Sequence, residues 1–571
     1  MYSRLLSWQR PTLLISIVCA LGLGCGGSSN PSDGGVSADS GTTASPSACP
    51  APAQAPMDSA WPEVFVGVAG CSDEGDGSRA TPFCGFGAAF DAIPAAPGVV
   101  TVLDGEYRLT DQLADGENRF RLSRPGSASA YFVIRADEGA SPRIYGSVPV
   151  AGASFEAFGA AGVVRASVPG LSRRASGLWT ASGRRIDHQS GDFGTRYHAD
   201  VSALESGRWT LADDSGTGCP NDDVAGCMLY INPAADLDIS SESFELSQAG
   251  LLSSTGSDYL VVRGLTIEFT QWTPIFVSGA EHVLIEDNEL AHNAAYGGNN
   301  AYGLALWSVN SSLVRRNRVL DTRYWVSANS WGITFMVSGD APDGDLWVCD
   351  NYLDDFQRAA IGSKGGASKL HAVGNEIHRA NIGVEVTGSR CDGPRCDVRF
   401  RGGAWVVGEN LMVDCNTAVD LAFLSADDEG FVDPSLVHNN VIVGAQFGVR
   451  VQNGDPLWTV RNNVFIDTQA FRLGGVDDAS VLFGASLDSD YNFFAEGATH
   501  VLFNSFAERG RWTLSEAQSA FDTEANSLSG PSPLDAADGY APPSGSPVLG
   551  AGDPSMYPDA PGPVNMGRVP Y

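Results

Sequence analysis

Apolar and polar residues alternate through most of the second half of the chain, in short runs that share one template. Each run has an aliphatic residue, two or three variable positions, an Asn and a further apolar residue. The runs centre on Asn288, Asn317, Asn351, Asn375, Asn410, Asn440, Asn463 and, more weakly, Asn492, at intervals of 29, 34, 24, 35, 30, 23 and 29 residues. Alternation with period two predicts short β-strands. A repeat of this length predicts a solenoid, because each unit can bury its apolar face only against its neighbours.

The Asn residues are expected at the turns between strands. Asn tolerates the left-handed backbone region, and its side chain can bond neighbouring backbone groups at a tight bend. This predicts a structural ladder of stacked turn residues rather than a catalytic one.

A second register lies between the Asn turns, in segments such as GITFM from Gly332 and GVEVT from Gly383. The second and fourth positions are mostly apolar and are expected inside, which places the third and fifth positions outside. The third positions form a row that we expect to be exposed, and the fifth form a parallel row: Ala305, Thr334, Gly362, Glu385, Asp420 and Arg450, then Trp307, Met336, Lys364, Thr387, Ala422 and Gln452. Adjacent coils lie about 4.8 Å apart. Glu385 and Asp420 are therefore predicted side by side, with Lys364 one coil earlier and Arg450 one coil later.

The flanking segments resemble those of secreted right-handed parallel β-helix proteins of the pectate-lyase-like superfamily. A strand and a loop precede the short helical segment GAAFDAI, and the "GxY" of GEYRL ends the first coil. The resemblance implies an all-β solenoid with an N-terminal cap and first coils at residues 57–150, an inserted antiparallel β module at 151–245, main coils at 246–510 and a C-terminal wrap at 511–571.

The first residues have the pattern of an export signal. Arg4 and Arg10 precede an apolar run that ends before Cys25. The stretch LGLGCGG resembles the cleavage box of bacterial lipoproteins, which implies a signal peptide at 1–25 and a lipid on Cys25. Residues 26–56 are rich in Gly, Ser and Pro and predict a flexible tether. We expect an outer-membrane or surface lipoprotein, or ordinary secretion, with membrane attachment only through the N-terminal lipid.

Charge and cysteines narrow the partners and the compartment. The formal net charge of −32 argues against nucleic acid, because there is no basic stripe to contact phosphates. An exported chain can form disulfides, and three pairs of cysteines could close small loops: Cys71 with Cys84, Cys219 with Cys227, and Cys391 with Cys396. Cys49, Cys349 and Cys415 have no obvious partner.

The first interpretation of the predicted neighbours Lys364, Glu385, Asp420 and Arg450 is the active site of a β-eliminating polysaccharide lyase. The chain has 33 arginines but only two lysines, Lys364 and Lys369. In a chain that uses arginine so heavily, a lysine can matter because its amine can lose a proton, which a guanidinium cannot. The run IGSKGGASKLHAVGNEI resembles the segment of β-helix alginate and chondroitin lyases that carries their catalytic lysine, and Lys364 matches that position. The family's arginine on the following coil is not matched, since Thr387 and Gly388 stand there. Arg450 or Arg390 could take the place of that arginine.

The second interpretation is a glycoside hydrolase in which Glu385 and Asp420 are the acid and the nucleophile. Their placement on neighbouring coils suits the roughly 5–5.5 Å carboxyl separation of a retaining mechanism. The same carboxylates, with Asp427 and Asp428 of the following loop, could instead hold Ca²⁺ through hard oxygen ligands.

The third interpretation is a glycan-binding or structural surface protein without catalysis, since a fold does not dictate a function. Exposed aromatic residues would then stack on sugar rings: Tyr296, Tyr302, Trp307 and Trp325. All three interpretations predict that an extracellular polysaccharide or glycan binds the face that carries Lys364, Glu385, Asp420 and Arg450.

Overall fold

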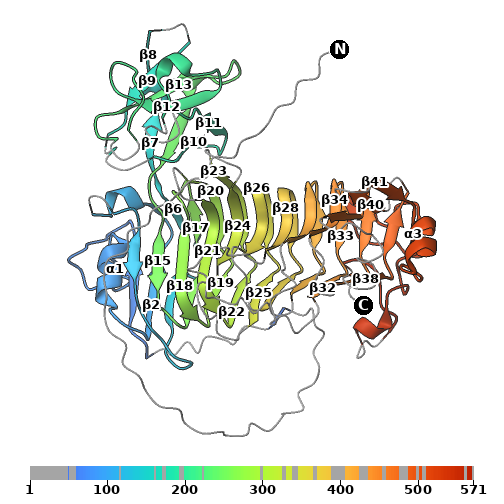
Figure 1. Cartoon of the computed structure of the whole chain (residues 1–571). Coiled ribbons are helices and arrows are strands. Elements are labelled where there is room, and N and C mark those ends of the chain that lie inside the picture. Colours follow the sequence, from blue (N-terminus) through green and yellow to red (C-terminus); the bar gives the residue numbers. More distant parts are fainter. Residues whose placement is uncertain are drawn as a thin grey trace, which may run out of the picture. The chain divides into compact units, whose positions relative to one another are not determined.

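The alternating runs form short parallel strands, and the strands of successive coils lie side by side in register (Figure 1). The computed structural model describes residues 49–50, 60–114, 117–159, 162–169, 171, 175–191, 198–220, 224–295, 300–324, 329–336, 345–363, 369–387, 405–422, 435–452, 458–474, 487–496, 501–504, 509–557 and 562–568. Three stacks of strands run along the coils. The chain is a right-handed parallel β-helix, as the repeat and the flanking segments predicted.

The first stack is a sheet of twelve parallel strands. They are β1 (Glu63–Val66), β2 (Gly98–Val102), β5 (Phe132–Ala136), β16 (Leu260–Arg263), β19 (Leu284–Glu286), β22 (Ser312–Arg315), β25 (Asp345–Cys349), β27 (Lys369–Val373), β29 (Val406–Gly408), β32 (Ser435–His438), β35 (Trp458–Arg461) and β38 (Leu487–Asp490).

The second stack follows the Asn turns. It comprises β3 (Glu106–Arg108), β6 (Arg143–Tyr145), β17 (Thr266–Glu268), β20 (Glu289–Ala295), β23 (Arg318–Tyr324), β26 (Tyr352–Ser363), β28 (Glu376–Thr387), β30 (Leu411–Val413), β33 (Val441–Val443), β36 (Val464–Ile466), β39 (Phe493–Ala495) and β42 (Leu528–Gly530).

The third stack contains the second register. It comprises β4 (Phe120–Leu122), β15 (Leu252–Thr255), β18 (Ile275–Glu281), β21 (Ala301–Asn310), β24 (Ser330–Met336), β31 (Thr417–Ala422), β34 (Phe447–Gln452), β37 (Phe471–Gly474) and β40 (Val501–Asn504). The long strands β26 and β28 belong to both the second and the third stack. A last strand, β41 (Arg509–Trp512), pairs antiparallel with β40.

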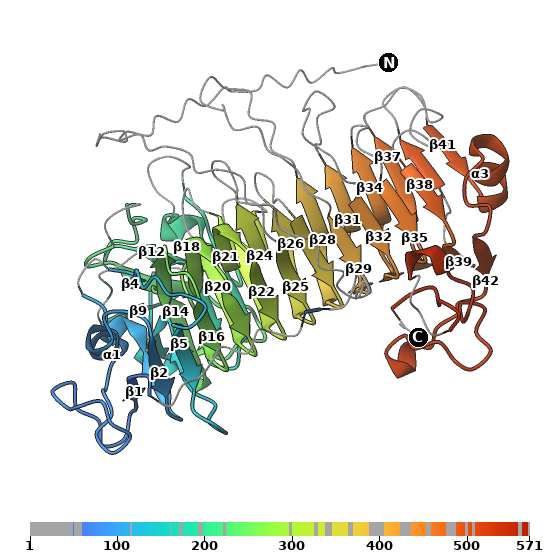
Figure 2. The same cartoon turned by 90° about the horizontal axis from the view of Figure 1, so that it is seen from below.

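One apolar core runs inside the coils, and a short helix closes each end of it (Figure 2). At the N-terminal end α1 (Phe86–Ala92) buries Phe86 and Phe90 against the first coils. At the C-terminal end α3 (Leu514–Phe521) contributes Leu514 and Ala517 to the same core. Within the described residues, no helix is long and apolar enough to cross a membrane.

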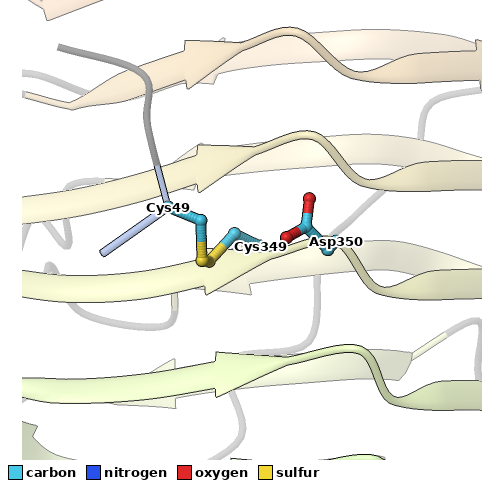
Figure 3. Close-up of side chains that lie close together, drawn as sticks. All are labelled: Cys49, Cys349 and Asp350. Carbon is cyan, nitrogen blue, oxygen red and sulfur yellow. A yellow bond between two sulfur atoms is a disulfide. The ribbon is translucent and has the colours of Figure 1, made fainter. Parts of the chain in front are cut away.

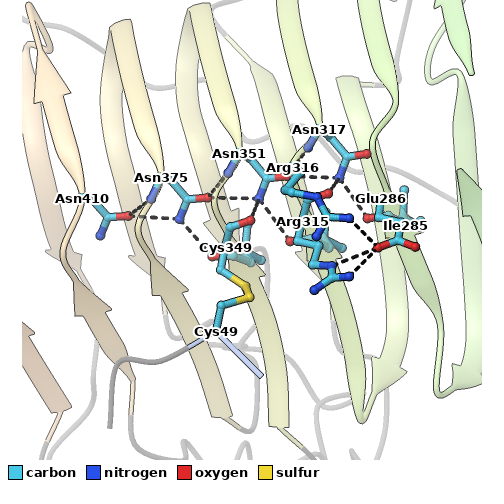
Figure 4. The surroundings of a disulfide bond; sticks show 12 residues. Cys49, Ile285, Glu286, Arg315, Arg316, Asn317, Cys349, Asn351, Asn375 and Asn410 are labelled. Carbon is cyan, nitrogen blue, oxygen red and sulfur yellow. Dashed lines mark hydrogen bonds and ion pairs between the residues drawn. A yellow bond between two sulfur atoms is a disulfide. The ribbon is translucent and has the colours of Figure 1, made fainter. Parts of the chain in front are cut away.

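The Asn ladder is a continuous chain of side-chain hydrogen bonds at one bend of the coils (Figure 4). Each Asn donates from Nδ2 to Oδ1 of the Asn on the next coil; Asn375, for example, donates to Asn410 at 3.0 Å. The same Nδ2 donates to a backbone carbonyl of the coil before, which for Asn375 is that of Val348 at 2.9 Å. The ladder residues are buried. It is therefore a structural element, as expected.

The prediction that these Asn residues adopt the left-handed backbone geometry is wrong. The residue before each Asn takes it instead: Asp287, Arg316, Asp350, Gly374, Glu409, Asn439, Asn462 and Tyr491 all have positive φ. The reversal turns the Asn side chain into the bend, where it can bridge two coils, while the preceding side chain points outward.

A buried carboxyl group closes the C-terminal end of the ladder. Asn492 donates from Nδ2 to Oε2 of Glu524 at 3.2 Å, and Ser489 and Ser527 donate their hydroxyls to the same carboxyl group. Burial raises the pKa of Glu524 to about 7, and these three hydrogen bonds lower it only in part.

Glu524→Gln is expected to change how stability depends on pH. Because the folded-state pKa lies above the ordinary value of 4.5 for a glutamate side chain, ionisation opposes folding, and stability falls as pH rises from about 4.5 to about 7. The full loss is on the order of 3 kcal/mol at 1.36 kcal/mol per pKa unit. Urea unfolding of the wild type at pH 5 and pH 8 should show this fall, and Glu524→Gln should remove most of it. Glu496→Gln, at an exposed carboxylate, should leave the fall unchanged.

A separate small sheet interrupts the coils between β6 and β15. Its strands are β7 (Ser147–Ala151), β8 (Glu156–Ala157), β9 (Val164–Ser167), β10 (Gly177–Thr180), β11 (Arg185–His188), β12 (Arg208–Ala212), β13 (Met228–Asn232) and β14 (Ser243–Ser247). Most pairs are antiparallel, as expected of the insert, but β11 and β12 are parallel. The insert has its own apolar core, in which Trp209 and Phe244 are fully buried.

Asp321 of β23 is one of the carboxylates through which the insert and the coils contact each other. It accepts hydrogen bonds from Trp179 Nε1 at 2.8 Å and Arg185 Nη1 at 2.7 Å, both from the insert. Burial raises the pKa of Asp321, but the hydrogen bond of His292 and the charges of Arg185 and Arg323 outweigh burial and hold it well below its usual range. The contact is therefore an ionised, multiply bonded anchor.

The C-terminal segment lies against the outer face of the second stack. Leu534, Val548 and Met566 pack on residues of β30, β33, β36 and β39. Asn439 donates to the carbonyl of Asn565 at 2.8 Å, which ties the segment to the bend of a coil. This is the wrap that the sequence indicated.

Disulfides join Cys71 to Cys84 and Cys219 to Cys227, the two short loops indicated by their spacing. A third, unexpected disulfide joins Cys49 to Cys349 at the end of β25 (Figure 3). It connects residues 300 positions apart, so no local spacing could have indicated it. Cys391 and Cys396 lie outside the described residues, and Cys415 is free and buried. Such disulfides are consistent with an exported protein.

Candidate functional site

The predicted neighbours lie in one row on the outer side of the third stack. Glu385 of β28 is the register partner of Asp420 of β31, and Asp420 is the partner of Arg450 of β34. The row continues to Gly362 of β26 on one side and Arg472 of β37 on the other. The adjacency of Glu385, Asp420 and Arg450 is therefore confirmed at the level of the backbone.

The expectation that this row is exposed is wrong. Glu385 is 3% exposed and Asp420 is 2% exposed, and Ala305 and Thr334 are also buried. Their apolar neighbours along the strands, such as Val384 and Val419, do face the inner core as predicted. The outer face thus carries a second buried layer, which strand alternation alone does not reveal.

Two residues that the register derived from the sequence did not place at the site, Arg358 and Trp331, form hydrogen bonds with Glu385. Arg358 Nη2 donates to Oε1 at 2.7 Å, and its Nε lies 3.1 Å from Oε1 and 3.0 Å from Oε2. Trp331 Nε1 donates to Oε2 at 3.1 Å. The guanidinium of Arg358 also lies 4.7 Å from the centre of the Trp331 ring. Both carboxylate oxygens of Glu385 are therefore engaged.

A local irregularity of β26 explains why Arg358 was missed. The pairing of β26 with β28 shifts between Phe356 and Ala359, so β26 contains one extra residue there. A bulge of this kind re-aims side chains at a sheet edge or near a site. The alternation rule fails across it, and no sequence signal for it was recognised.

Asp420 forms a two-point ion pair with Arg450. Arg450 Nε donates to Oδ1 at 2.8 Å, and Nη2 donates to Oδ2. Burial alone would lower the pKa of Arg450, but the hydrogen bond and charge of Asp420 raise it overall. The next arginine of the row, Arg472, is ion-paired with no carboxylate in the described part of the chain, and its guanidinium lies 4.5 Å from the centre of the Phe447 ring. Burial and the charge of Arg450 lower the pKa of Arg472.

Several predicted site residues lie outside the described residues: Lys364, Asp427, Asp428, Cys25, Arg390, Tyr296 and Trp325. Lys364 follows directly on Ser363, the last residue of β26. Lys369 is the exposed first residue of β27. The two lysines therefore flank the segment that connects β26 to β27.

Aromatic rings gather on the same outer face, on the coils before Glu385. Tyr302 of β21 stacks on Trp331 of β24 at 5.5 Å between ring centres. Trp307 contacts Phe276 at 4.9 Å and Trp272 at 6.2 Å. Tyr302 is buried rather than exposed, and burial raises its pKa, whereas Trp272 and Trp307 are only partly buried. Trp307 fits the predicted sugar-stacking role better than Tyr302.

The described residues do not assemble a calcium site at Glu385 and Asp420. Each of these carboxylates is paired with an arginine instead, and a cation is a poor neighbour for a metal ion. The grouping that comes nearest to a ligand set is Cys49, Cys349 and Asp350, but its two sulfur atoms are bonded to each other (Figure 3). Calcium stays a prediction that would need Asp427 and Asp428.

No family model matches this chain, and no curated protein matches it either. Solved structures with a similar fold include the complex of XylC with xylose, at 14% identity and a TM-score of 0.43, covering 82% of this chain and 86% of that one. They also include the pectate lyase Pel9A, at 10% identity and a TM-score of 0.35 (89% and 96% covered), and a family 28 exopolygalacturonase of Yersinia enterocolitica, at 13% and 0.34 (82% and 78%). Similarity at this level carries no argument about activity.

Proposed function

We propose that this protein binds an acidic polysaccharide along the outer row of the third stack and cleaves it by β-elimination, with Lys364 as the base. The observation that supports the proposal is the row itself. It places Glu385, Asp420, Arg450 and Arg472 on consecutive strands, beside the end of the strand that precedes Lys364.

Arg472 is the residue best suited to bind the substrate's carboxylate. Arg358 and Arg450 already hold Glu385 and Asp420, whereas Arg472 has no carboxylate partner among the described residues. An arginine fork matches a carboxylate in geometry and charge. Neutralising that carboxylate makes the adjacent C–H proton easier to remove, which is the first requirement of elimination.

In the proposed step the amine of Lys364 removes the proton on the carbon next to the carboxylate. The electron pair forms a carbon–carbon double bond, the bond to the glycosidic oxygen breaks, and that oxygen takes a proton from the lysine ammonium or from water. No oxidant or metal is needed. The product carries an unsaturated sugar at its new end.

The experiment is a panel of polysaccharides incubated with the full chain. Polygalacturonate, alginate and chondroitin represent acidic polymers, and xylan and a glucan represent neutral ones. Ultraviolet absorbance detects the new double bond, and a reducing-end assay counts every cleavage. Unsaturated ends from an acidic polymer support the proposal. Cleavage of neutral polymers only, or binding without cleavage, would contradict it.

The glycoside hydrolase is the second candidate, favoured by the register pairing of Glu385 with Asp420. A general acid must direct a proton toward the glycosidic oxygen. Both oxygens of Glu385 accept hydrogen bonds from Arg358 and Trp331 instead, and Arg450 engages both oxygens of Asp420. This arrangement suits a pair of structural carboxylates better than an acid and a nucleophile.

Glu385→Gln separates the two candidates. If Glu385 is the general acid, the variant should lose roughly 10²–10⁴-fold in rate. Under the elimination proposal it should stay within about tenfold, a change of about 1.4 kcal/mol in the barrier. Glu289→Gln is the matched control, because Glu289 also pairs with an arginine, Arg318, but at the surface. Thermal unfolding of both variants checks that a lower rate is not a loss of folded protein.

A further inference from the structure

A second cationic side chain with no carboxylate partner lies at the other end of the same face. Arg119 precedes β4 and is 6% exposed. Its Nε donates to Oδ1 of Asn118 at 3.1 Å, and its Nη1 is buried with no hydrogen-bond partner among the described residues. Two other arginines of the coils with buried or half-buried side chains are paired with carboxylates, Arg108 with Glu245 and Arg323 with Asp321.

An unpaired buried cation is costly, because burial removes water without supplying another partner. Burial, together with the charge of Arg121, lowers the pKa of Arg119 to about 10. A group in this condition gains when an anion supplies the missing hydrogen bonds and charge. The nearby acid Glu117 does not do so, since it pairs with Arg121 at 3.3 Å.

The surroundings of Arg119 are those of a sugar subsite. Its guanidinium lies 4.3 Å from the centre of the Trp272 ring. Trp272 in turn contacts Trp307 and Phe276, and the two tryptophans are only partly buried. Aromatic rings offer the apolar face of a sugar a stacking surface, while a guanidinium can bind a carboxylate on its rim.

The strand register places this cluster on the row that leads to Glu385. Arg121, two residues after Arg119, is followed by Ser253, Phe276, Ala305, Thr334, Gly362 and Glu385, each the register partner of the one before. Six such steps of about 4.8 Å separate Arg121 from Glu385 by roughly 29 Å. A polymer lying along the coils would reach both places, whereas a short oligosaccharide would not.

We propose that Arg119, Trp272 and Trp307 form a distal subsite that binds the carboxylate and ring of an acidic sugar in the same polymer chain. The inference rests on the proposed function for the class of polymer, but not for the reaction. It makes the protein selective for long acidic chains aligned with the coil axis. Arg119 acts in binding and takes no part in bond cleavage.

The test measures binding by calorimetry, in the Lys364→Ala background if the parent chain cleaves the probe. The probes are long and trisaccharide fractions of polygalacturonate and of alginate, together with long fractions whose carboxyl groups have been reduced to alcohols. Arg119→Met, which keeps the apolar stem, should weaken binding of a long acidic fraction about tenfold, equal to about 1.4 kcal/mol. It should leave the trisaccharides and the reduced polymer unchanged. Arg119→Lys should restore part of the loss.

Arg165→Met is the matched control, because Arg165 also stacks on a ring, that of Phe158 at 4.9 Å, within the insert. Equal binding of long acidic fractions by the parent and Arg119→Met would overturn the distal subsite alone. So would an equal loss for the acidic and the reduced polymer, which would indicate a structural role. If the parent binds no acidic polymer, both the subsite and the proposed function fail.

Discussion

Lys364→Ala is expected to lower the rate of unsaturated product formation by roughly 10²–10⁴-fold, the usual contribution of a general base. The loss should fall on turnover more than on binding, since Arg472 and the aromatic residues would still hold the polymer. The wild-type rate should rise with pH, because only the neutral amine accepts a proton. Steady-state kinetics on the polymer identified by the panel, followed by ultraviolet absorbance, checks this.

The chain offers its own control for that variant. Lys369, the only other lysine, begins β27 and is exposed. Lys369→Ala should keep the wild-type rate. Lys364→Arg should be as inactive as Lys364→Ala, because a guanidinium keeps its proton. An active Lys364→Arg would mean that position 364 supplies only positive charge, and the assignment of the base would be wrong.

Asn375→Ala is expected to destabilise the coils by about 3–5 kcal/mol, since removing one partner of a buried hydrogen bond costs about 1–3 kcal/mol for each group left unpaired. Asn375 Oδ1 accepts from the backbone N–H of Asn351 at 3.1 Å and from its Nδ2 at 3.0 Å. Its own Nδ2 donates to Asn410 and Val348. The substitution interrupts the ladder in its middle (Figure 4).

Urea unfolding measures this loss, and Asn416→Ala is its control. Asn416 donates to the side chain of Asn381, but this bond is at the surface. Its replacement should change the free energy of unfolding by less than about 0.5 kcal/mol, as surface substitutions usually do. An equally small change for Asn375→Ala would show that the ladder does not carry the stability assigned to it.

The repeat and the strand register could be read from the sequence because each depends on local periodicity. Every coil places an Asn at the same bend, and the period of two then separates inner from outer side chains. For this reason the pairing of Glu385 with Asp420 was predictable from residue counting. The left-handed residue was misplaced by one position, because Asn commonly takes that geometry itself and nothing local shows that its neighbour takes it here.

The contacts that hold the site were not predictable in this way. Arg358 reaches Glu385 only because β26 carries an extra residue, and Trp331 approaches it from another coil, 54 positions away in sequence. The burial of Glu385 and Asp420 depends on side chains from other coils. The Cys49–Cys349 disulfide likewise depends on where the N-terminal segment lies. Each of these contacts is determined by packing between coils, which the pattern of residues in a single sequence does not predict.

The masses of the products test the central claim most directly. A digest of the acidic polymer by the full chain should be analysed by mass spectrometry before any further reaction. Elimination conserves the atoms of the substrate, so the combined mass of two fragments should equal that of the parent chain, with the unsaturated end on one of them. Fragments that together exceed the parent by one water molecule would show hydrolysis and contradict the proposal.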